Sequence, residues 1–188
     1  SHWRPRVRFM LCLLAFVLCV FALARPQAGA KLEKVKRQGI EVMVAVDVSN
    51  SMLATDLAPS RMSRAKQILS RLIDYLHNDK VGLLVFAGDS YVQMPMTTDV
   101  SSAKMFLSNI SPGMVPVQGT AIGSAIRMSM GLFSRQEGMS RTIIIITDGE
   151  NHEDDAVAAA KMARENGVTV NVLGVGTAKG SPIPITGT

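Results

Sequence analysis

Three oxygen-bearing side chains, Asp47, Ser49 and Ser51, fall within five residues. This D-x-S-x-S run follows an apolar stretch directly, and its alternate side chains can converge on one side of the chain. A hard cation such as Mg²⁺ prefers a near-octahedral set of oxygen ligands, so the spacing suits a divalent-ion site. Ser, Asp and Asn are also common where a strand turns into a helix. Taken alone, the run fits either a metal site or an ordinary turn.

Two more polar groups stand at comparable places further along the chain. Gln118-Gly119-Thr120 precedes a helical pattern and places a hydroxyl at its start, and Thr147-Asp148-Gly149 ends an apolar run with a carboxylate. In open α/β sheets, ligands bind at the carboxyl ends of the strands. Polar residues directly after strands are therefore the candidates for a site.

Buried strands alternate with amphipathic helices through the body of the chain. The patterns predict strands at 40–46, 81–88, 142–147 and 168–175, a small edge strand at 91–94 that Pro95 stops, and helices at 60–76, 101–110, 120–133 and 155–166. Ser60 is the expected cap of the first helix. Buried strands joined by helices predict an open, doubly wound (Rossmann-like) α/β domain with a mostly parallel sheet covered on both faces.

An apolar segment precedes this domain. Residues 9–24 read FMLCLLAFVLCVFALA, with Arg4, Arg6 and Arg8 before them and Arg25 after them. The stretch predicts a transmembrane helix with a basic flank at 1–25, a linker at 26–39 and the α/β domain at 40–188. The alternative is a secretory signal cleaved after Ala24. We favour the anchor, and both interpretations place the remainder at or across a membrane.

Composition and charge exclude several classes of protein. The apolar fraction of 47% is ample for a core and excludes a disordered chain. The net charge of +5 arises in the first 37 residues, which hold eight Lys or Arg and one Glu, whereas the rest holds twelve basic and fourteen acidic residues. Nucleic acid is therefore not an expected partner of the folded body. Both cysteines lie in the apolar run, so no disulfide framework is expected.

The order D-x-S-x-S, then a Gly-Thr loop, then Thr-Asp-Gly resembles the metal-ion-dependent adhesion site (MIDAS) of von Willebrand factor A (vWA) domains, over essentially all of 38–188. The resemblance implies that Ser49 and Ser51 ligate Mg²⁺ (or Mn²⁺) directly, and that Thr120 does so in the ligand-competent state. It implies that Asp47 and Asp148 act mostly through bound waters. An ion held by neutral hydroxyls stays electrophilic and accepts a carboxylate from an acidic protein partner.

The match to the aerotolerance (Bat) family of bacterial membrane proteins is closer. It is carried by the segment ending in ALARPQ and by DVSNSMLATDL, VGLLVFAGDSYVQMPMT, VPVQGT and TDGENHE. This resemblance implies the bacterial inner (cytoplasmic) membrane, with the vWA domain in the periplasm. It also implies other vWA or Bat proteins and a MoxR-type AAA+ ATPase system as partners, although a cytoplasmic ATPase cannot touch a periplasmic domain directly.

Two features depart from the family pattern. Ala121 stands where many relatives carry an acid, which affects the surroundings of the ion and leaves its direct ligands in place. The family pattern also includes a final helix and strand, followed by another membrane span, and we expect these to be missing from residues 1–188.

Two rival functions remain open at this point. The first is a metal-dependent hydrolase or phosphotransferase that uses Asp47 or Ser49. Against it, Ser49 lacks a G-x-S-x-G context, no paired His is placed by the sequence, and the site has no evident catalytic base. The second is a metal-free scaffold with the same fold. We expect a binding module and not an enzyme.

Overall fold

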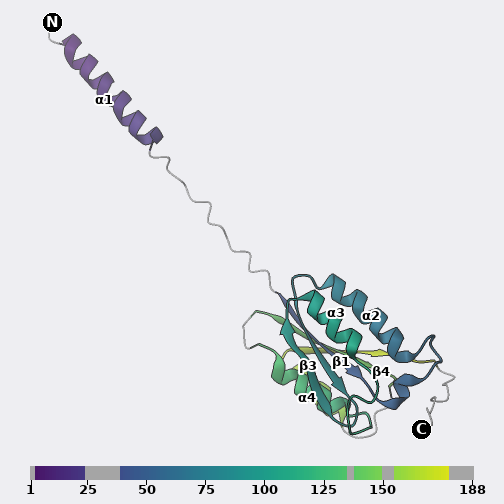
Figure 1. Ribbon diagram of the computed structural model, residues 1–188. Coiled ribbons are helices and arrows are strands. Elements are labelled where there is room, and N and C mark those ends of the chain that lie inside the picture. The colour runs from purple at the N-terminus through teal and green to yellow at the C-terminus, as the bar shows by residue number, and fades with distance from the viewer. Residues whose placement is uncertain (1–2, 24–38, 135–137, 150–154, 178–188) are drawn as a thin grey trace. The chain divides into compact units, whose positions relative to one another are not determined.

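The computed structural model describes residues 3–23, 39–134, 138–149 and 155–177. The chain divides into two compact units, Ser1–Arg37 and Gln38–Thr188, and each is described by itself. The first contains helix α1 (Trp3–Leu23), drawn in purple in Figure 1. No helix among the described residues combines the length and apolarity needed to cross a membrane. The predicted linker at 26–39 lies outside the described residues except for Gly39.

The second unit is built on a five-stranded sheet in the order β3-β2-β1-β4-β5. All neighbouring strands are parallel except β2 and β3, which are antiparallel. The strands are β1 (Ile40–Asp47), β2 (Lys80–Phe86), β3 (Ser90–Thr97), β4 (Ser140–Thr147) and β5 (Val168–Gly174). The predicted doubly wound, mostly parallel sheet is confirmed.

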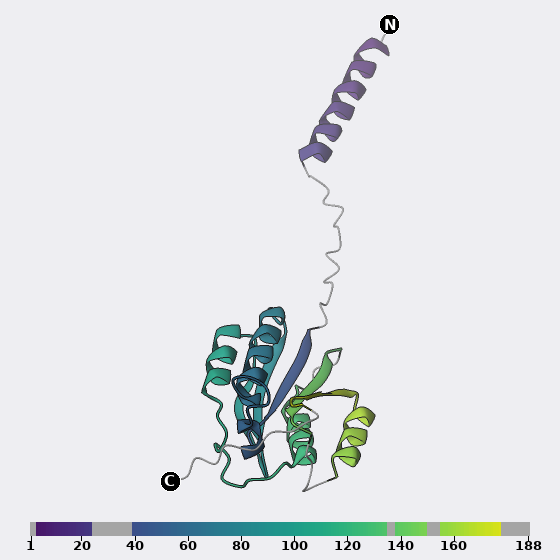
Figure 2. The same cartoon turned by 90° about the vertical axis from the view of Figure 1, so that its right-hand side faces the viewer.

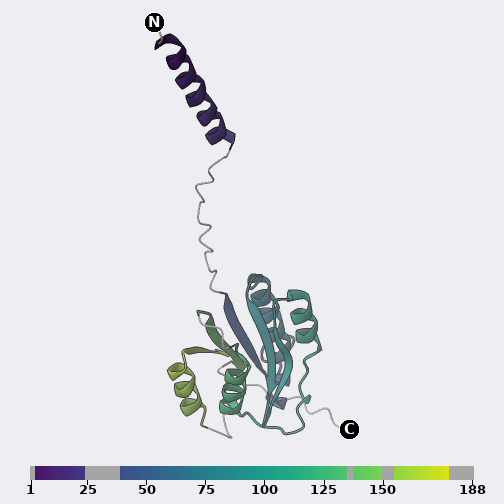
Figure 3. The ribbon, with the colours of Figure 1, turned by 90° about the vertical axis from the view of Figure 1, so that its left-hand side faces the viewer.

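Helices cover both faces of the sheet, with α2 and α3 on one face and α4 and α5 on the other (Figures 2 and 3). Ser60 caps α2 as predicted, because its hydroxyl accepts the Ser63 N–H at 3.1 Å. The carboxylates of Asp99 and Asp155 cap α3 and α5. The helices are α2 (Arg61–Tyr75), α3 (Val100–Asn109), α4 (Ile122–Leu132) and α5 (Ala156–Glu165), with a short 3₁₀ turn, η1 (Asn50–Leu53).

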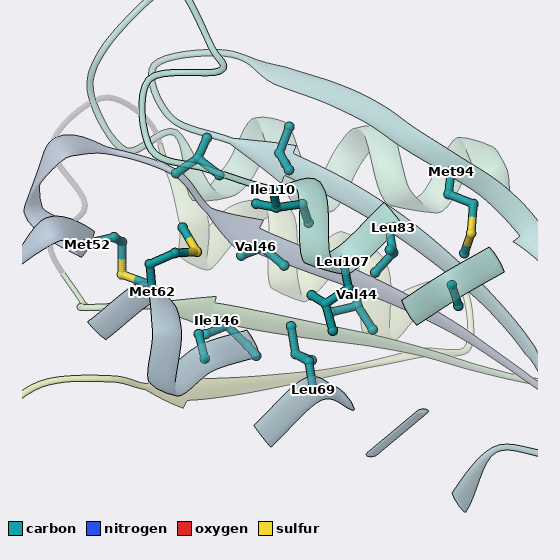
Figure 4. Close-up of a cluster of buried hydrophobic side chains, with 14 of the residues drawn as sticks. Val44, Val46, Met52, Met62, Leu69, Leu83, Met94, Leu107, Ile110 and Ile146 are labelled. Carbon is teal, nitrogen blue, oxygen red and sulfur yellow. The ribbon is translucent and has the colours of Figure 1, made fainter. Parts of the chain in front are cut away.

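The central strand β1 is buried on both faces, which explains its nearly continuous apolar sequence. Val44 and Val46 pack in the cluster under α2 and α3, beside Leu69 and Leu107 (Figure 4). Met43 lies in the cluster on the opposite face. Because β1 sits between two apolar layers, its carboxyl end is fixed rigidly, and the D-x-S-x-S run starts from that end.

The edge strand β3 is longer than predicted. Its sequence suggested a strand at 91–94 that Pro95 stops, but the strand continues through Pro95 to Thr97. Proline is tolerated there because β3 is an edge strand, and because the pairing with β2 is irregular between the Val81–Thr97 and Leu83–Met94 pairs. The missing N–H therefore costs no regular ladder hydrogen bond.

Glu41 is the exception to the apolar pattern of β1, and its side chain is fully buried. One carboxylate oxygen lies 3.1 Å from the Lys80 ammonium, and the other accepts the Ser134 N–H at 2.9 Å. Burial alone raises the pKa of Glu41, but the hydrogen bonds from Ser134 and Lys80 outweigh it, so this pKa lies below its usual value. The carboxylate thus ties β1 to β2 and to the segment after α4.

Replacing Glu41 by glutamine should lower the free energy of unfolding by about 2 kcal/mol at pH 7, because a buried charge-assisted network is broken. Since the folded pKa is depressed, this contribution is present above the unfolded pKa and is lost as pH falls through the lower folded value. Urea unfolding of the full chain at pH 7 and at about pH 3.5 measures both effects. The exposed Glu165→Gln is the control; equal effects of the two variants would contradict the assignment.

Candidate metal centre

The candidate residues gather where the connections from the sheet change direction. From the central strand β1, the chain continues to β2 on one side, whereas β4 lies on the other. Val46 pairs with Ile146, so Asp47, the last residue of β1, and Asp148, directly after β4, lie at the carboxyl ends of two adjacent parallel strands. Binding sites of doubly wound sheets form at this kind of switch point.

Asp47 is buried, and both of its carboxylate oxygens accept hydrogen bonds. Oδ1 accepts the backbone N–H of Ser49 at 2.9 Å, and Oδ2 accepts the Thr147 hydroxyl at 2.7 Å. The carboxylate therefore fixes the turn that leaves β1 and joins it to the end of β4.

The two serine hydroxyls converge, as the alternate spacing predicted. Ser49 Oγ and Ser51 Oγ lie 2.9 Å apart. The turn η1 enforces this geometry: the Met52 N–H donates to the Ser49 carbonyl and the Ala54 N–H to the Ser51 carbonyl, both at 3.1 Å. The fully buried Met52 anchors the turn in the core. The sequence patterns did not predict this 3₁₀ turn.

Thr120 lies at the same carboxyl end of the sheet, in the loop that precedes α4. The Gly113 N–H donates to the Val48 carbonyl at 3.2 Å, and the Ala121 N–H donates to the Ala87 carbonyl at 2.7 Å. The first bond attaches the loop to the D-x-S-x-S run, and the second attaches it to the segment after β2. Thr120 itself is 4% exposed, so its side chain is held inside this junction.

The two carboxylate oxygens of Asp148 have different surroundings. Its side chain is 2% exposed, and Oδ2 accepts a hydrogen bond from Arg61 Nη1 at 2.9 Å. Oδ1 is buried and has no hydrogen-bond partner among the described residues. Burial, reinforced by the negative charge of Asp148, raises the pKa of Asp47 above its usual value. A cation bound near the two carboxylates would therefore stabilise their ionised forms.

The available donors fit a hard divalent ion. They are the hydroxyls of Ser49, Ser51 and Thr120, with the two carboxylates beside them. No group of three or more His, Cys, Asp and Glu gathers within the described ranges, so neutral oxygens dominate the set. Oxygen donors without thiolate or imidazole suit Mg²⁺ and Mn²⁺. An unsatisfied buried carboxylate oxygen is costly by itself and is relieved by a bound cation or its water.

All five predicted residues lie at the carboxyl end of the sheet. The sequence analysis did not identify several other residues that position them. Thr147 orients Asp47, Gly88 lies against the loop before Thr120, and Arg61 joins Asp56 to Asp148. Thr147 carried a signal, since a polar residue ended an otherwise apolar strand. Arg61 carried no such signal, because it is one of several basic residues between the apolar positions of its helical pattern. The acidic residues Glu150, Glu153 and Asp154 lie outside the described ranges.

Comparison with known proteins gives a consistent result. The family model for the von Willebrand factor type A domain matches residues 42–150. The crystal structure of BatB from Bacteroides thetaiotaomicron is 59% identical, with a TM-score of 0.77, over 80% of this chain and 73% of that one. An aerotolerance-related membrane protein from Bacteroides fragilis, crystallised with multiple mutations to serines, is 57% identical with a TM-score of 0.77, over 80% and 74%.

A more distant structure shows the same fold. Proximal thread matrix protein 1 from the mussel byssus, described with a zinc-occupied MIDAS motif, is 18% identical with a TM-score of 0.64, over 72% of this chain and 38% of that one. The metal is described for that protein, and the similarity to this chain is one of fold. The chain spans 48–60% of the length of the curated bacterial relatives that it matches at 26–29% identity. The chain belongs to the von Willebrand factor type A domain family and, within it, to the aerotolerance-related Bat membrane proteins.

Proposed function

We propose that this chain is a membrane-attached vWA module that binds a protein partner through a Mg²⁺- or Mn²⁺-dependent MIDAS. Asp47, Ser49, Ser51, Thr120 and Asp148 hold the ion, and the partner contributes an Asp or Glu carboxylate. The observation that carries the proposal is the paired Ser49 and Ser51 hydroxyls, 2.9 Å apart at the end of β1, beside a buried Asp148 oxygen that has no partner.

Some residues of the site would bind the ion, and others orient the residues that bind it. Ser49, Ser51 and Thr120 offer neutral oxygens, which leave most of the charge of a divalent ion uncompensated. Asp47 orients the turn through Ser49 and Thr147. When bound, the ion supplies a Lewis-acidic position that accepts a carboxylate oxygen from outside the chain. An acidic protein surface is the partner chemistry that this arrangement favours, including that of another vWA or Bat protein.

The same contacts favour binding over catalysis. A general base must be able to reach the proton that it removes. Both oxygens of Asp47 already accept hydrogen bonds, and Asp148 Oδ2 is paired with Arg61. Asp47 is therefore not arranged as a free base beside the serine hydroxyls, and Asp148 Oδ1, unpaired among the described residues, is the oxygen that we assign to the ion or its bound water.

Calorimetric titration of Mg²⁺ and Mn²⁺ into the full chain tests the metal site. We expect saturable binding of one ion per chain with either metal. Absence of binding at millimolar concentrations of both metals would contradict the proposal.

We also propose that α1 attaches the chain to the bacterial inner membrane, with the vWA domain in the periplasm. Phe9, Leu11 and Phe16 are among the large apolar side chains that α1 exposes, and Arg4 and Arg8 stand near its start. Exposed apolar side chains next to cationic groups favour contact with a lipid bilayer. The Bacteroides fragilis relative is named as a membrane protein.

Fractionation of bacterial cells that express the full chain tests this attachment. We expect the chain to stay with the membranes after carbonate extraction, with α1 retained by mass. We expect externally added protease to degrade the domain in spheroplasts. A chain cut after Ala24 and released into the soluble fraction would instead identify the segment as a signal. Protection in intact spheroplasts, with degradation only after lysis, would reverse the orientation.

A further inference from the structure

Arg61 at the start of α2 is a candidate positioning residue beside the metal centre, and its side chain is only 11% exposed. Its Nε and Nη2 donate to Asp56 Oδ1 and Oδ2 at 2.8 and 3.0 Å. Its remaining terminal nitrogen, Nη1, donates to Asp148 Oδ2 at 2.9 Å. One planar guanidinium thus joins the loop after η1 to the end of β4.

Asp56 fixes the orientation of this guanidinium. Its Oδ2 also accepts the Thr177 N–H at 2.8 Å and the Thr177 hydroxyl at 3.1 Å. The backbone at Gly176 lies close to the guanidinium, because a Cβ built there would be 3.4 Å from three of its atoms. The forked, two-bond contact with Asp56 is directional. The guanidinium is therefore held from the side opposite Asp148.

This arrangement determines which oxygen of Asp148 is bonded to Arg61 and which is left for another ligand. With Nε and Nη2 engaged by Asp56, the guanidinium reaches Asp148 through Nη1 and takes Oδ2. Asp148 Oδ1 is left buried, without a hydrogen-bond partner in the part of the chain that the structure describes. A guanidinium free of Asp56 could instead grip both oxygens of Asp148 in a fork, which is the usual Arg–carboxylate geometry. Asp56 prevents this competition.

We propose that Arg61, restrained by Asp56, is a positioning residue for the metal centre: it holds Asp148 by Oδ2 and thereby presents Oδ1 to the ion or its bound water. The inference rests on the proposed metal site and extends it to two residues outside the D-x-S-x-S, Thr and Asp set. Partners one step removed from a metal hold its ligands in place, and changing them typically weakens metal binding 10- to 100-fold.

Mg²⁺ titration of variants of the full chain tests the proposal. Arg61→Lys keeps the charge but loses the fork, so we expect Kd to rise about tenfold or more. Asp56→Asn keeps the size but releases the guanidinium toward both Asp148 oxygens, and we expect a similar rise. The control is Arg64→Lys, at an exposed position one turn further along α2, which should leave Kd unchanged.

A double-mutant cycle separates positioning from general stability. In an Asp148→Asn background, Arg61→Lys should add no further loss of Mg²⁺ affinity. The unfolding free energy without metal is measured for every variant, and Asp56→Asn supplies the test if Arg61→Lys does not fold. Wild-type Kd in Arg61→Lys or in Asp56→Asn, or an undiminished loss in the Asp148→Asn background, would overturn the inference alone. No Mg²⁺ binding by the wild type would overturn both it and the proposed function.

Discussion

Replacing Asp47 by alanine is expected to abolish the thermal stabilisation that Mg²⁺ gives to the wild-type chain. An ion that binds only the folded state adds about 2.7 kcal/mol to the unfolding free energy at 100 times Kd. For a domain of this size, that corresponds to a rise in Tm of roughly 5–10 °C. Without the Asp47 carboxylate, Ser49 N–H and the Thr147 hydroxyl lose their acceptor, so the turn that carries both serine hydroxyls is released.

Scanning calorimetry with Mg²⁺ or with EDTA measures this effect. The control is Asp74→Ala, which removes a half-exposed carboxylate paired with Lys104 and should keep the full Mg²⁺-induced shift. Asp47→Asn keeps the side-chain volume and serves if the alanine variant does not fold. A normal Mg²⁺-induced rise of Tm in a folded Asp47 variant would rule out the assigned role.

Replacing Gly88 by alanine is expected to weaken metal binding although Gly88 is not a ligand, because the added methyl group would displace the loop before Thr120. A Cβ built at Gly88 would lie 2.6 Å from the Gln118 carbonyl oxygen and 2.7 Å from Val117 Cγ1. The first contact is with backbone, so the loop before Thr120 must move. We expect Gly88→Ala to raise the Kd for Mg²⁺ at least tenfold and to lower the unfolding free energy by about 1–3 kcal/mol.

Gly131→Ala is the matched control for this prediction. Gly131 lies near the end of α4, and a Cβ built there meets nothing within 4 Å. Because alanine favours the helix, this variant should gain about 0.5–1 kcal/mol of stability and keep its Mg²⁺ affinity. Calorimetric titration and urea unfolding of both variants provide the comparison. An unchanged Kd in Gly88→Ala would show that the position of Thr120 does not matter to the ion.

The fold could be predicted because local patterns and long-range packing agree in this chain. The apolar run of β1 requires cover on both faces, and the amphipathic helices that follow it in the chain supply that cover. The edge strand β3 was underestimated because the tolerance for Pro95 depends on its place in the sheet, which a local pattern does not carry. The 3₁₀ turn was missed because the buried Met52 stabilises it through the tertiary core.

Asp47, Ser49, Ser51 and Asp148 could be placed near one another because the carboxyl ends of parallel strands lie at the same end of a sheet. Thr120 precedes a helix, and its inclusion and the ligand roles of all five residues rest on the family resemblance. The residues that position these ligands could not be predicted from the sequence. Asp56, Arg61 and Thr177 meet only when the start of α2 and the segment after β5 come together. Gly88 was predicted as the last residue of a strand at 81–88, whereas β2 ends at Phe86 and the Gln118 carbonyl lies against Gly88. Such contacts are set by tertiary packing and leave no local spacing signal.

The central claim is that a metal held here accepts a carboxylate from outside the chain. Proton relaxation of the acetate methyl group measures this directly, with Mn²⁺ bound to an excess of the full chain and acetamide as the uncharged probe of the same shape. We expect acetate to be relaxed several-fold more strongly than acetamide by the Mn²⁺-loaded chain, and we expect no such difference with Mn²⁺–EDTA. Equal relaxation of acetate and acetamide by the Mn²⁺-loaded chain would contradict the claim.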